Sequence, residues 1–196
     1  MRVLKSRYKG YYFIVVMLLA MTTMGSVIAY ADSGTATATV RPGGLTVANA
    51  SNLVSLSLAN KKKVRMVNYS LPITVIDARG SGAGWNLMIT STTFQLVEHD
   101  KHASTNQLPA NASSVVGVSA SCGTNSTCTG PTNGVIYPLL VPAGTTPPPP
   151  VKFFDATTQS GLGKFNIVMM VNVTVPASTE RGIYTSTLTI TIASGP

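Results

Sequence analysis

Few residues of this chain combine the types and spacing that chemistry requires. The run Glu98-His99-Asp100-Lys101-His102 holds four potential metal ligands and both histidines of the chain. Catalytic zinc needs three well-placed protein ligands that are held in position by further hydrogen bonds. A polar loop without a helical frame seldom supplies such ligands. We therefore expect a solvated loop, with no metal and no other cofactor.

No catalytic constellation can be assembled from the remaining side chains. Serine and threonine are abundant, but the Gly-x-Ser-x-Gly nucleophile elbow is absent from the sequence. Of the six acidic residues, Asp77 belongs to a glycine-rich turn and the others are scattered. A hydrolase would need a nucleophile with a base, or a pair of carboxylates. The sequence predicts a protein that is not an enzyme.

The positive charge is concentrated at the start of the chain. The 196 residues carry a net charge of +8, and Arg2, Lys5, Arg7 and Lys9 supply half of it. An uncharged apolar stretch, residues 11–30, follows and ends in an Ala-x-Ala site. This pattern predicts a signal-peptide helix over residues 1–31, and an uncleaved membrane anchor is the alternative. The protein is then secreted or displayed on the cell surface, and it meets the membrane only through this segment if it is uncleaved.

Without the signal segment, the chain is one mildly basic domain of residues 32–196. Ten basic and six acidic residues remain in it, for a net charge of +4. The one dense basic cluster, residues 61–65, lacks the interleaved aromatic residues that stack on bases. We expect no nucleic-acid partner. The cluster is either a solvated turn or a contact for an anionic polymer of the cell surface.

The two cysteines, Cys122 and Cys128, are separated by a loop-like sequence. An even cysteine count in an exported chain predicts a disulfide. Closing so small a ring stabilises the fold by about 2–3 kcal/mol at most. Two cysteines without a nearby histidine are too few ligands for structural zinc.

The elements that position these residues are strands. Apolar residues alternate with Thr, Ser or Asn in many short segments that Gly, Pro and Asn turns separate. This pattern predicts an all-β fold, an antiparallel β-sandwich. The expected strands are 35–40, 45–47, 52–58, 73–76, 85–90, 115–119, 135–141, 151–154, 165–175 and 183–193. The middle of 165–175 is apolar enough to be buried on both faces. Irregular inserts are expected at 98–114, 119–134 and 142–150.

The most specific stretch, residues 72–87, reads PITVIDARGSGAGWNL. A strand ends at Asp77, small residues turn the chain, and Trp85 opens the next strand with Leu87 on the same face. Asp77 and Arg79 are close enough to pair across the turn or to bind its amides. No phosphate loop is present, because the Gly-Lys-Ser/Thr ending is missing.

This stretch resembles the first signature of the WxL domain, a family found on the surface of Gram-positive bacteria. The second signature of that family, Tyr-Thr-x-Thr-Leu-Thr-Trp-x-Leu, is similar to residues 184–192 here, with Ile190 and Ile192 in place of Trp and Leu. The resemblance implies an exported β-sandwich over residues 32–196 that binds cell-wall peptidoglycan or partner surface proteins. Its ligand-binding residues would be Asp77, Arg79, Trp85, Leu87, Tyr184 and Leu188.

Two alternatives remain open from the sequence. Trp85 either stacks on a sugar or partner, or fills the core as Leu87, Leu188, Ile190 and Ile192 are expected to do. The protein is either a wall-binding or partner-binding module, or a structural subunit of an extracellular fibre or coat. If the protein is such a structural subunit, the Thr-rich strands 35–40 and 185–192 would pair between molecules.

Overall fold

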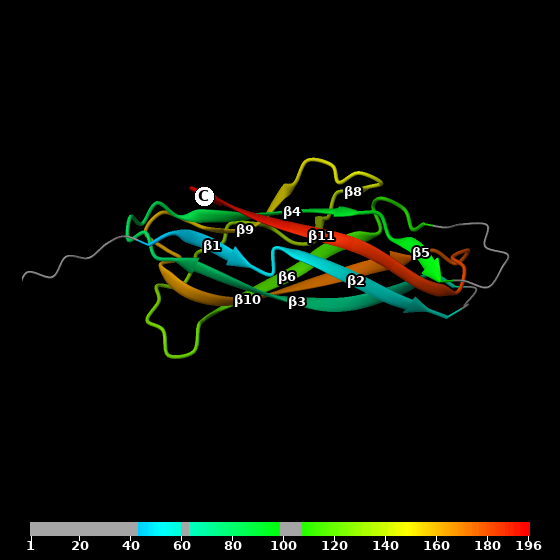
Figure 1. Ribbon diagram of the computed structural model, residues 1–196, viewed down its shortest axis with the longest axis horizontal. Helices are drawn as coiled ribbons and strands as arrows, with labels where there is room; N and C mark the ends of the chain where they lie inside the picture. The colour runs from blue at the N-terminus through cyan, green and yellow to red at the C-terminus, as the bar shows by residue number, and fades with distance from the viewer. Residues whose placement is uncertain (1–42, 60–62, 99–106) are drawn as a thin grey trace, which may run out of the picture. The chain divides into compact units, whose positions relative to one another are not determined.

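The alternation of apolar and hydroxyl side chains produces strands throughout the described part of the chain. The structure is a computed structural model that describes residues 43–59, 63–98 and 107–196, all within one compact unit (Figure 1). These residues form eleven β-strands and no helix. None of the described residues therefore forms a helix long and apolar enough to cross a membrane. The expected signal-peptide helix and the expected strand 35–40 lie outside the described residues.

One sheet, here called sheet A, has five antiparallel strands in the order β1-β3-β10-β6-β7. Its strands are β1 (Leu45–Ala48), β3 (Arg65–Asp77), β10 (Gly163–Val175), β6 (Ser113–Cys122) and β7 (Leu139–Leu140). The longest pairing joins β3 to β10 along all 13 residues of each strand without a bulge. The β1 strand pairs only with the last four residues of β3, Thr74 to Asp77.

The other sheet, sheet B, is built around β11. It contains β2 (Ser51–Leu58), β4 (Trp85–Thr92), β5 (Gln95–Glu98), β8 (Ala143–Gly144), β9 (Val151–Ala156) and β11 (Gly182–Ser194). On one side β11 pairs with β2, and on the other it pairs first with β5 and then with β4. The β4 strand continues the sheet to β9 and, in a short parallel pairing, to β8.

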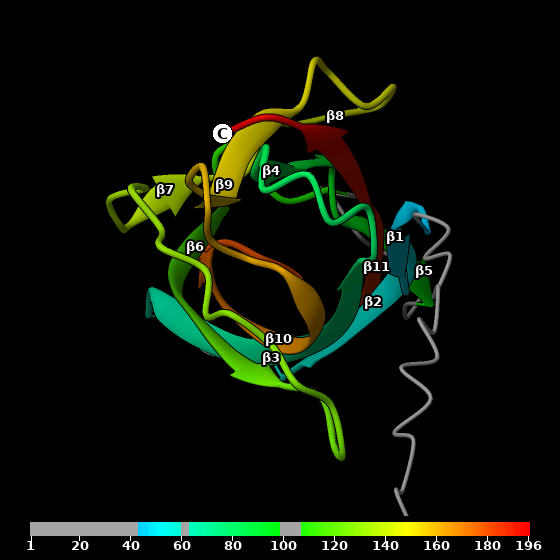
Figure 2. The same ribbon diagram turned by 90° about the vertical axis from the view of Figure 1, so that its left-hand side faces the viewer.

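The chain passes between the two sheets seven times along its described length, and the sheets curl into a half-barrel (Figure 2). Asn49, at φ 62°, and Ala50 separate β1 in sheet A from β2 in sheet B. Another crossing lies between β7 and β8, where the Val141 amide donates to Ser113 and the Pro142 carbonyl accepts from Ser91. The inner faces form one core, whose largest fully buried side chains are Trp85, Tyr184, Phe153, Phe165, Ile73, Leu87, Ile89, Leu108, Ile167, Met169, Leu188 and Ile190. The all-β prediction is confirmed.

Several strand boundaries differ from the expectation. The expected strand 73–76 is the end of a 13-residue strand that begins at Arg65, the last residue of the basic cluster. The expected strand 135–141 is wrong except for the two residues of β7, because Pro138 lacks an amide donor and Tyr137 turns its hydroxyl to the Phe153 carbonyl. The sequence pattern also missed β5, and β6 runs into two of the expected inserts.

The β10 strand is buried on one face only. Its inner residues are fully buried, but the outer residues Val168 and Met170 are 38% and 45% exposed. The expectation of burial on both faces was wrong, because no described element covers the outer face of sheet A. The apolar run 165–175 therefore identifies a strand at the centre of sheet A, and not a strand that is covered on both faces.

Candidate functional site

The glycine-rich turn between β3 and β4 is the motif that the sequence singled out. Gly80, Gly82 and Gly84 all have φ between 64° and 74°, which is the left-handed region. At Gly84 the backbone also passes close to β9, and a Cβ atom there would lie 2.4 Å from the Ala156 carbonyl oxygen. The turn therefore needs glycine for tight packing against its own domain.

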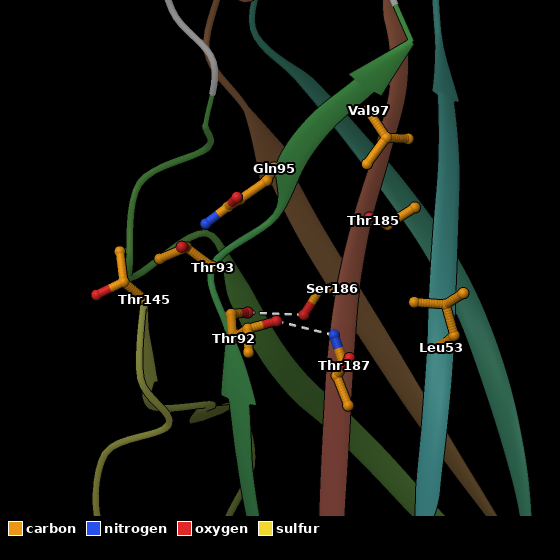
Figure 3. A pocket seen from close by; sticks show the side chains of 9 residues that line it. All are labelled: Leu53, Thr92, Thr93, Gln95, Val97, Thr145, Thr185, Ser186 and Thr187. Atoms are coloured by element: carbon orange, nitrogen blue, oxygen red, sulfur yellow. Dashed lines mark hydrogen bonds between the residues drawn. The ribbon is translucent and has the colours of Figure 1, made fainter.

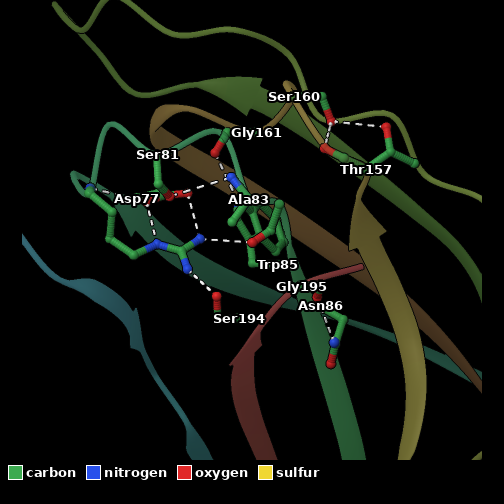
Figure 4. A network of polar contacts seen from close by, with 12 residues as sticks. Asp77, Ser81, Ala83, Trp85, Asn86, Thr157, Ser160, Gly161, Ser194 and Gly195 are labelled. Atoms are coloured by element: carbon green, nitrogen blue, oxygen red, sulfur yellow. Dashed lines mark hydrogen bonds and ion pairs between the residues drawn. The ribbon is translucent and has the colours of Figure 1, made fainter.

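Arg79 binds Asp77 across this turn, and Figure 4 draws the network of polar contacts around Asp77. Nε and Nη2 of Arg79 each donate to the Asp77 carboxylate at 2.9 Å, and the Arg79 amide donates to the same carboxylate at 3.1 Å. Nη2 also donates to the Gly84 carbonyl at 2.7 Å, and Nη1 donates to the Ser194 hydroxyl. These bonds hold the pKa of Asp77 below its ordinary value and raise the pKa of Arg79. The pair therefore fills both predicted roles, because Arg79 binds Asp77 across the turn and Asp77 accepts from a backbone amide of the turn.

Trp85 lies entirely inside the core, with no exposed surface. Its Nε1 donates to the Gly161 carbonyl at 2.8 Å, and its ring centre lies 5.8 Å from that of Phe154 and 6.2 Å from that of Phe165. Gly161 is required there, because a Cβ would lie 2.6 Å from the indole nitrogen. The only tryptophan of the chain thus offers no face to a ligand in this structure.

The structure brings the two signature-like segments side by side. Ile190 pairs with Ile89, Ile192 with Leu87, and Ser194 with Trp85. Beyond β11, the Gly195 carbonyl accepts from Asn86 and its amide donates to Gly84. Five of the six predicted ligand-binding residues are buried, and the Arg79 side chain is 18% exposed; the buried five are Asp77, Trp85, Leu87, Tyr184 and Leu188.

Cys122 and Cys128 form a disulfide, with their Cα atoms 5.8 Å apart. The bond closes a short loop at the end of β6, and the Thr129 amide ties this loop to Leu162. Such a bond is compatible with an extracellular location. The expected solvated loop lies mostly outside the described residues, which contain no cluster of three metal-ligating side chains.

No aromatic ring is exposed in the described part of the chain. Six of its eight rings are buried, and Tyr69 and Tyr137 are half-buried against the core. Burial raises the pKa of both tyrosines, and the buried Tyr69 hydroxyl has no partner among the described residues. The described surface therefore has no aromatic platform on which a sugar ring would stack.

A shallow hollow of about 210 Å³ opens on the outer face of sheet B, where β4 leaves β11 and β5 takes its place (Figure 3). Thr92 fills this gap, because its carbonyl accepts from the Ser186 hydroxyl and its own hydroxyl accepts from the Thr187 amide. Hydroxyl and amide groups dominate the lining, which consists of Leu53, Thr92, Thr93, Gln95, Val97, Thr145, Thr185, Ser186 and Thr187. The sequence showed these threonines only as a strand pattern.

The other candidate is a strand edge that the sequence did not reveal. Because β1 covers only Thr74 to Asp77, the edge of β3 from Arg65 to Ile73 that faces away from β10 pairs with no described strand. We call it the free edge of β3. The inward side chains Val67, Tyr69 and Leu71 are half-buried along it, whereas Ile73 and Val75 near β1 are 1% and 0% exposed.

The direction of the backbone groups along this edge follows from one hydrogen bond. Asn49, just after β1, donates from Nδ2 to the Pro72 carbonyl at 3.2 Å. Both backbone groups of a strand residue point to the same edge, and successive residues alternate between edges. Met66, Asn68 and Ser70 therefore direct their amides and carbonyls to the free edge. Pro72 lacks an amide at this edge only, so it costs the pairing with β10 nothing.

No protein-family model, curated protein or solved structure matches this chain.

Proposed function

We propose that this protein is a non-catalytic, exported structural subunit of the cell surface that assembles with other protein chains by β-strand addition. The observation that carries the proposal is the free edge of β3. A long strand that lacks a neighbour on one side is a template for pairing with another chain. Natural proteins usually protect such edges with charges or proline, and from Met66 to Leu71 this one has neither.

The chemistry of sheet A supports assembly over catalysis. The outward side chains of β3 and β10 are uncharged from Met66 to Pro72 and from Asn166 to Thr174. The exposed Met66, Val168 and Met170 add apolar surface to this face. An uncharged, partly apolar sheet face beside an unpaired edge favours contact with another protein. The predicted signal segment and the disulfide both fit a working place outside the cell.

The experiment is to express the full chain in a host that exports it and to measure its association state. We expect oligomers or filaments whose fraction rises with protein concentration, in sedimentation velocity runs and in negative-stain electron micrographs. A protein that stays monomeric from micromolar to millimolar concentration, with the disulfide intact, would overturn the proposal.

The hollow on sheet B favours a second candidate function, the binding of a wall glycan. Its lining of hydroxyl and amide groups can exchange hydrogen bonds with the hydroxyls of a sugar chain. Thr93 is one of the lining residues, and its buried hydroxyl oxygen has no partner among the described residues. In this candidate function the sugar lies against the threonines of β11 instead of against Trp85.

Retention on purified cell walls tests this second candidate. The variant with Thr185→Val and Thr187→Val removes two hydroxyls from the rim and keeps the side-chain shape. Reduced retention of this variant supports glycan binding at the hollow, with Thr191→Val as a matched control on the same face. Equal retention of all three proteins, or no retention of any, would contradict it.

A further inference from the structure

The free edge of β3 offers more burial to an added strand than the unpaired edge of β2 does. The inward residues Val67, Tyr69 and Leu71 are half-buried because β1 ends before it reaches them. A strand that continued the position of β1 would cover these three side chains, as β1 covers Ile73 and Val75. Burying such apolar surface stabilises a complex by about 25 cal/mol per Å².

The edge of β2 that faces away from β11 is also unpaired among the described residues, but it has little to gain. Its inward residues Val54, Leu56 and Leu58 are already only 8%, 5% and 5% exposed. An added strand there would gain backbone hydrogen bonds and almost no apolar burial. The free edge of β3 is therefore the better acceptor.

The chain contains a segment with the pattern that this acceptor needs. Residues 35–40 read TATATV, with no charge, glycine or proline. In an extended conformation, Thr side chains lie on one face and Ala36, Ala38 and Val40 on the other. Six residues span about 20 Å at 3.4 Å per residue, which is within the nine residues of the free edge. The small apolar face would lie over Val67, Tyr69 and Leu71, and the Thr face would point outward.

The other Thr-rich segment, residues 185–192, is not available as a donor. From Thr185 to Thr189 most of its residues already have strands on both sides, with β2 on one and β5 or β4 on the other. Residue Ile190 donates its amide to the Ala50 carbonyl and pairs with β4. Of the two segments that the sequence offered, only 35–40 can act as the donor.

A complete donor strand cannot come from the same copy, because too few residues separate Val40 from Gly43. The Gly43 amide donates to the Ala78 carbonyl, and this bond fixes Gly43 beside Ala78. Val40 is three residues before Gly43, so it lies at most about 11 Å away. The free edge begins at Ile73, five residues and about 17 Å along β3 from Ala78. The six residues 35–40 of the same chain therefore cannot all lie along this edge.

We infer that residues 35–40 of a second copy of this chain add as a strand to the free edge of β3. This inference rests on the proposed function, and it names the donor segment and the acceptor edge through which the copies would assemble. Each copy would give its segment to one neighbour and accept the segment of another. Such a contact joins two different surfaces, so it propagates head to tail into a ring or an open filament.

The first test removes one hydrogen-bond donor from the acceptor. Ser70→Pro deletes an amide that points to the free edge and leaves the bonds to β10 in place, as Pro72 already does two residues away. We expect the assembled fraction to be lost in Ser70→Pro and kept in the matched control Ser70→Ala. On the donor side, either Thr37→Pro or Ala38→Pro must delete an amide that faces β3, so at least one of them should give the same loss.

The second test is a cysteine cross-link between separately made variants. Thr37→Cys mixed with Ser70→Cys or Asn68→Cys should give a disulfide-linked heterodimer, because these side chains all point outward from the joined strands. Ala38→Cys with the same acceptors should give none, because its side chain points inward. Thr37→Cys mixed with Thr191→Cys, which is exposed on sheet B, is the control for random collision.

The outcomes separate this inference from the proposed function. In one outcome the wild-type protein assembles, Ser70→Pro assembles equally well, and Thr37→Cys cross-links no more than Ala38→Cys does. That result would overturn strand addition at β3 by residues 35–40, and the proposed assembly would stand. An internal disulfide in a monomeric Thr37→Cys/Ser70→Cys double variant would also overturn it. If the wild-type protein does not assemble at all, the proposed function fails first.

Discussion

Arg79 holds Asp77 and the end of β11 with one guanidinium group. It donates two 2.9 Å bonds to the carboxylate, and it reaches Gly84 and Ser194 with its remaining donors. Because the Asp77 side chain has no exposed surface, this pair is the one place in the described domain where a fully buried carboxylate depends on a single cation. The clasp joins the turn after β3 to the last strand of the fold.

Replacing Arg79 with Ala should destabilise the domain by about 3 kcal/mol, because it leaves a buried carboxylate without its partner. Urea unfolding followed by circular dichroism measures this loss. Ser194→Ala removes only one of the four contacts and serves as the control, with an expected cost of about 1 kcal/mol. Equal stability of Arg79→Ala and the wild-type protein would mean that the clasp does not support the fold.

The same pair makes the stability depend on acid pH. Arg79 lowers the pKa of Asp77 in the folded state, so this contribution is fully present above the ordinary pKa of Asp, about 3.9. It is lost as the pH falls from that value through the lowered pKa of the folded state. The difference in unfolding free energy between wild type and Arg79→Ala should therefore shrink below about pH 4. A difference that stays constant down to pH 2 would contradict this account.

Two glycines of similar backbone conformation should respond differently to alanine. Gly80 and Gly161 have φ of 68° and 69°, but a Cβ at Gly80 meets nothing within 4 Å, whereas one at Gly161 would lie 2.4 Å from the Ala156 Cβ. Gly80→Ala should cost about 1 kcal/mol of backbone strain. Gly161→Ala should cost about 2 kcal/mol more, from overpacking against Trp85. Thermal unfolding of both variants compares their losses of stability. A smaller loss for Gly161→Ala than for Gly80→Ala would contradict this prediction.

Trp85 should report its burial directly by fluorescence. As the only tryptophan of the chain, it should emit at short wavelength and resist quenching by iodide until the domain unfolds. Trp85→Ala should cost about 3–5 kcal/mol, the usual range for a large aromatic ring in a core. Long-wavelength emission that iodide quenches in the folded protein would place the ring on the surface and restore its role as a ligand contact.

The pattern of alternating residues was sufficient to predict the class of fold and most of the strands. It placed Trp85 and Leu87 on the same face of their strand, as the structure has them. It also predicted the disulfide and the contact between Asp77 and Arg79. These features depend on residues that are close in sequence, where local spacing determines geometry.

The free edge was beyond the reach of the sequence. Whether Val67 and Leu71 are covered depends on where β1 leaves sheet A, and that depends on Asn49 and on long-range pairing with β11. The burial of Trp85 is likewise set by Phe154, Gly161 and Phe165, which are distant along the chain. Such relationships come from the register between strands, which a single sequence does not specify.

The disulfide should stabilise the domain without affecting assembly. The seven-residue ring from Cys122 to Cys128 lowers the conformational entropy of the unfolded chain, which stabilises the folded domain by about 2 kcal/mol. The variant with both cysteines changed to Ser should lose about that much stability in urea. Because β6 lies on the far side of β10 from β3, the free edge is not disturbed. The variant should therefore associate like the wild type under conditions in which both are folded. A folded variant that no longer associates would mean that the loop at the end of β6, rather than the free edge of β3, carries the contact between copies.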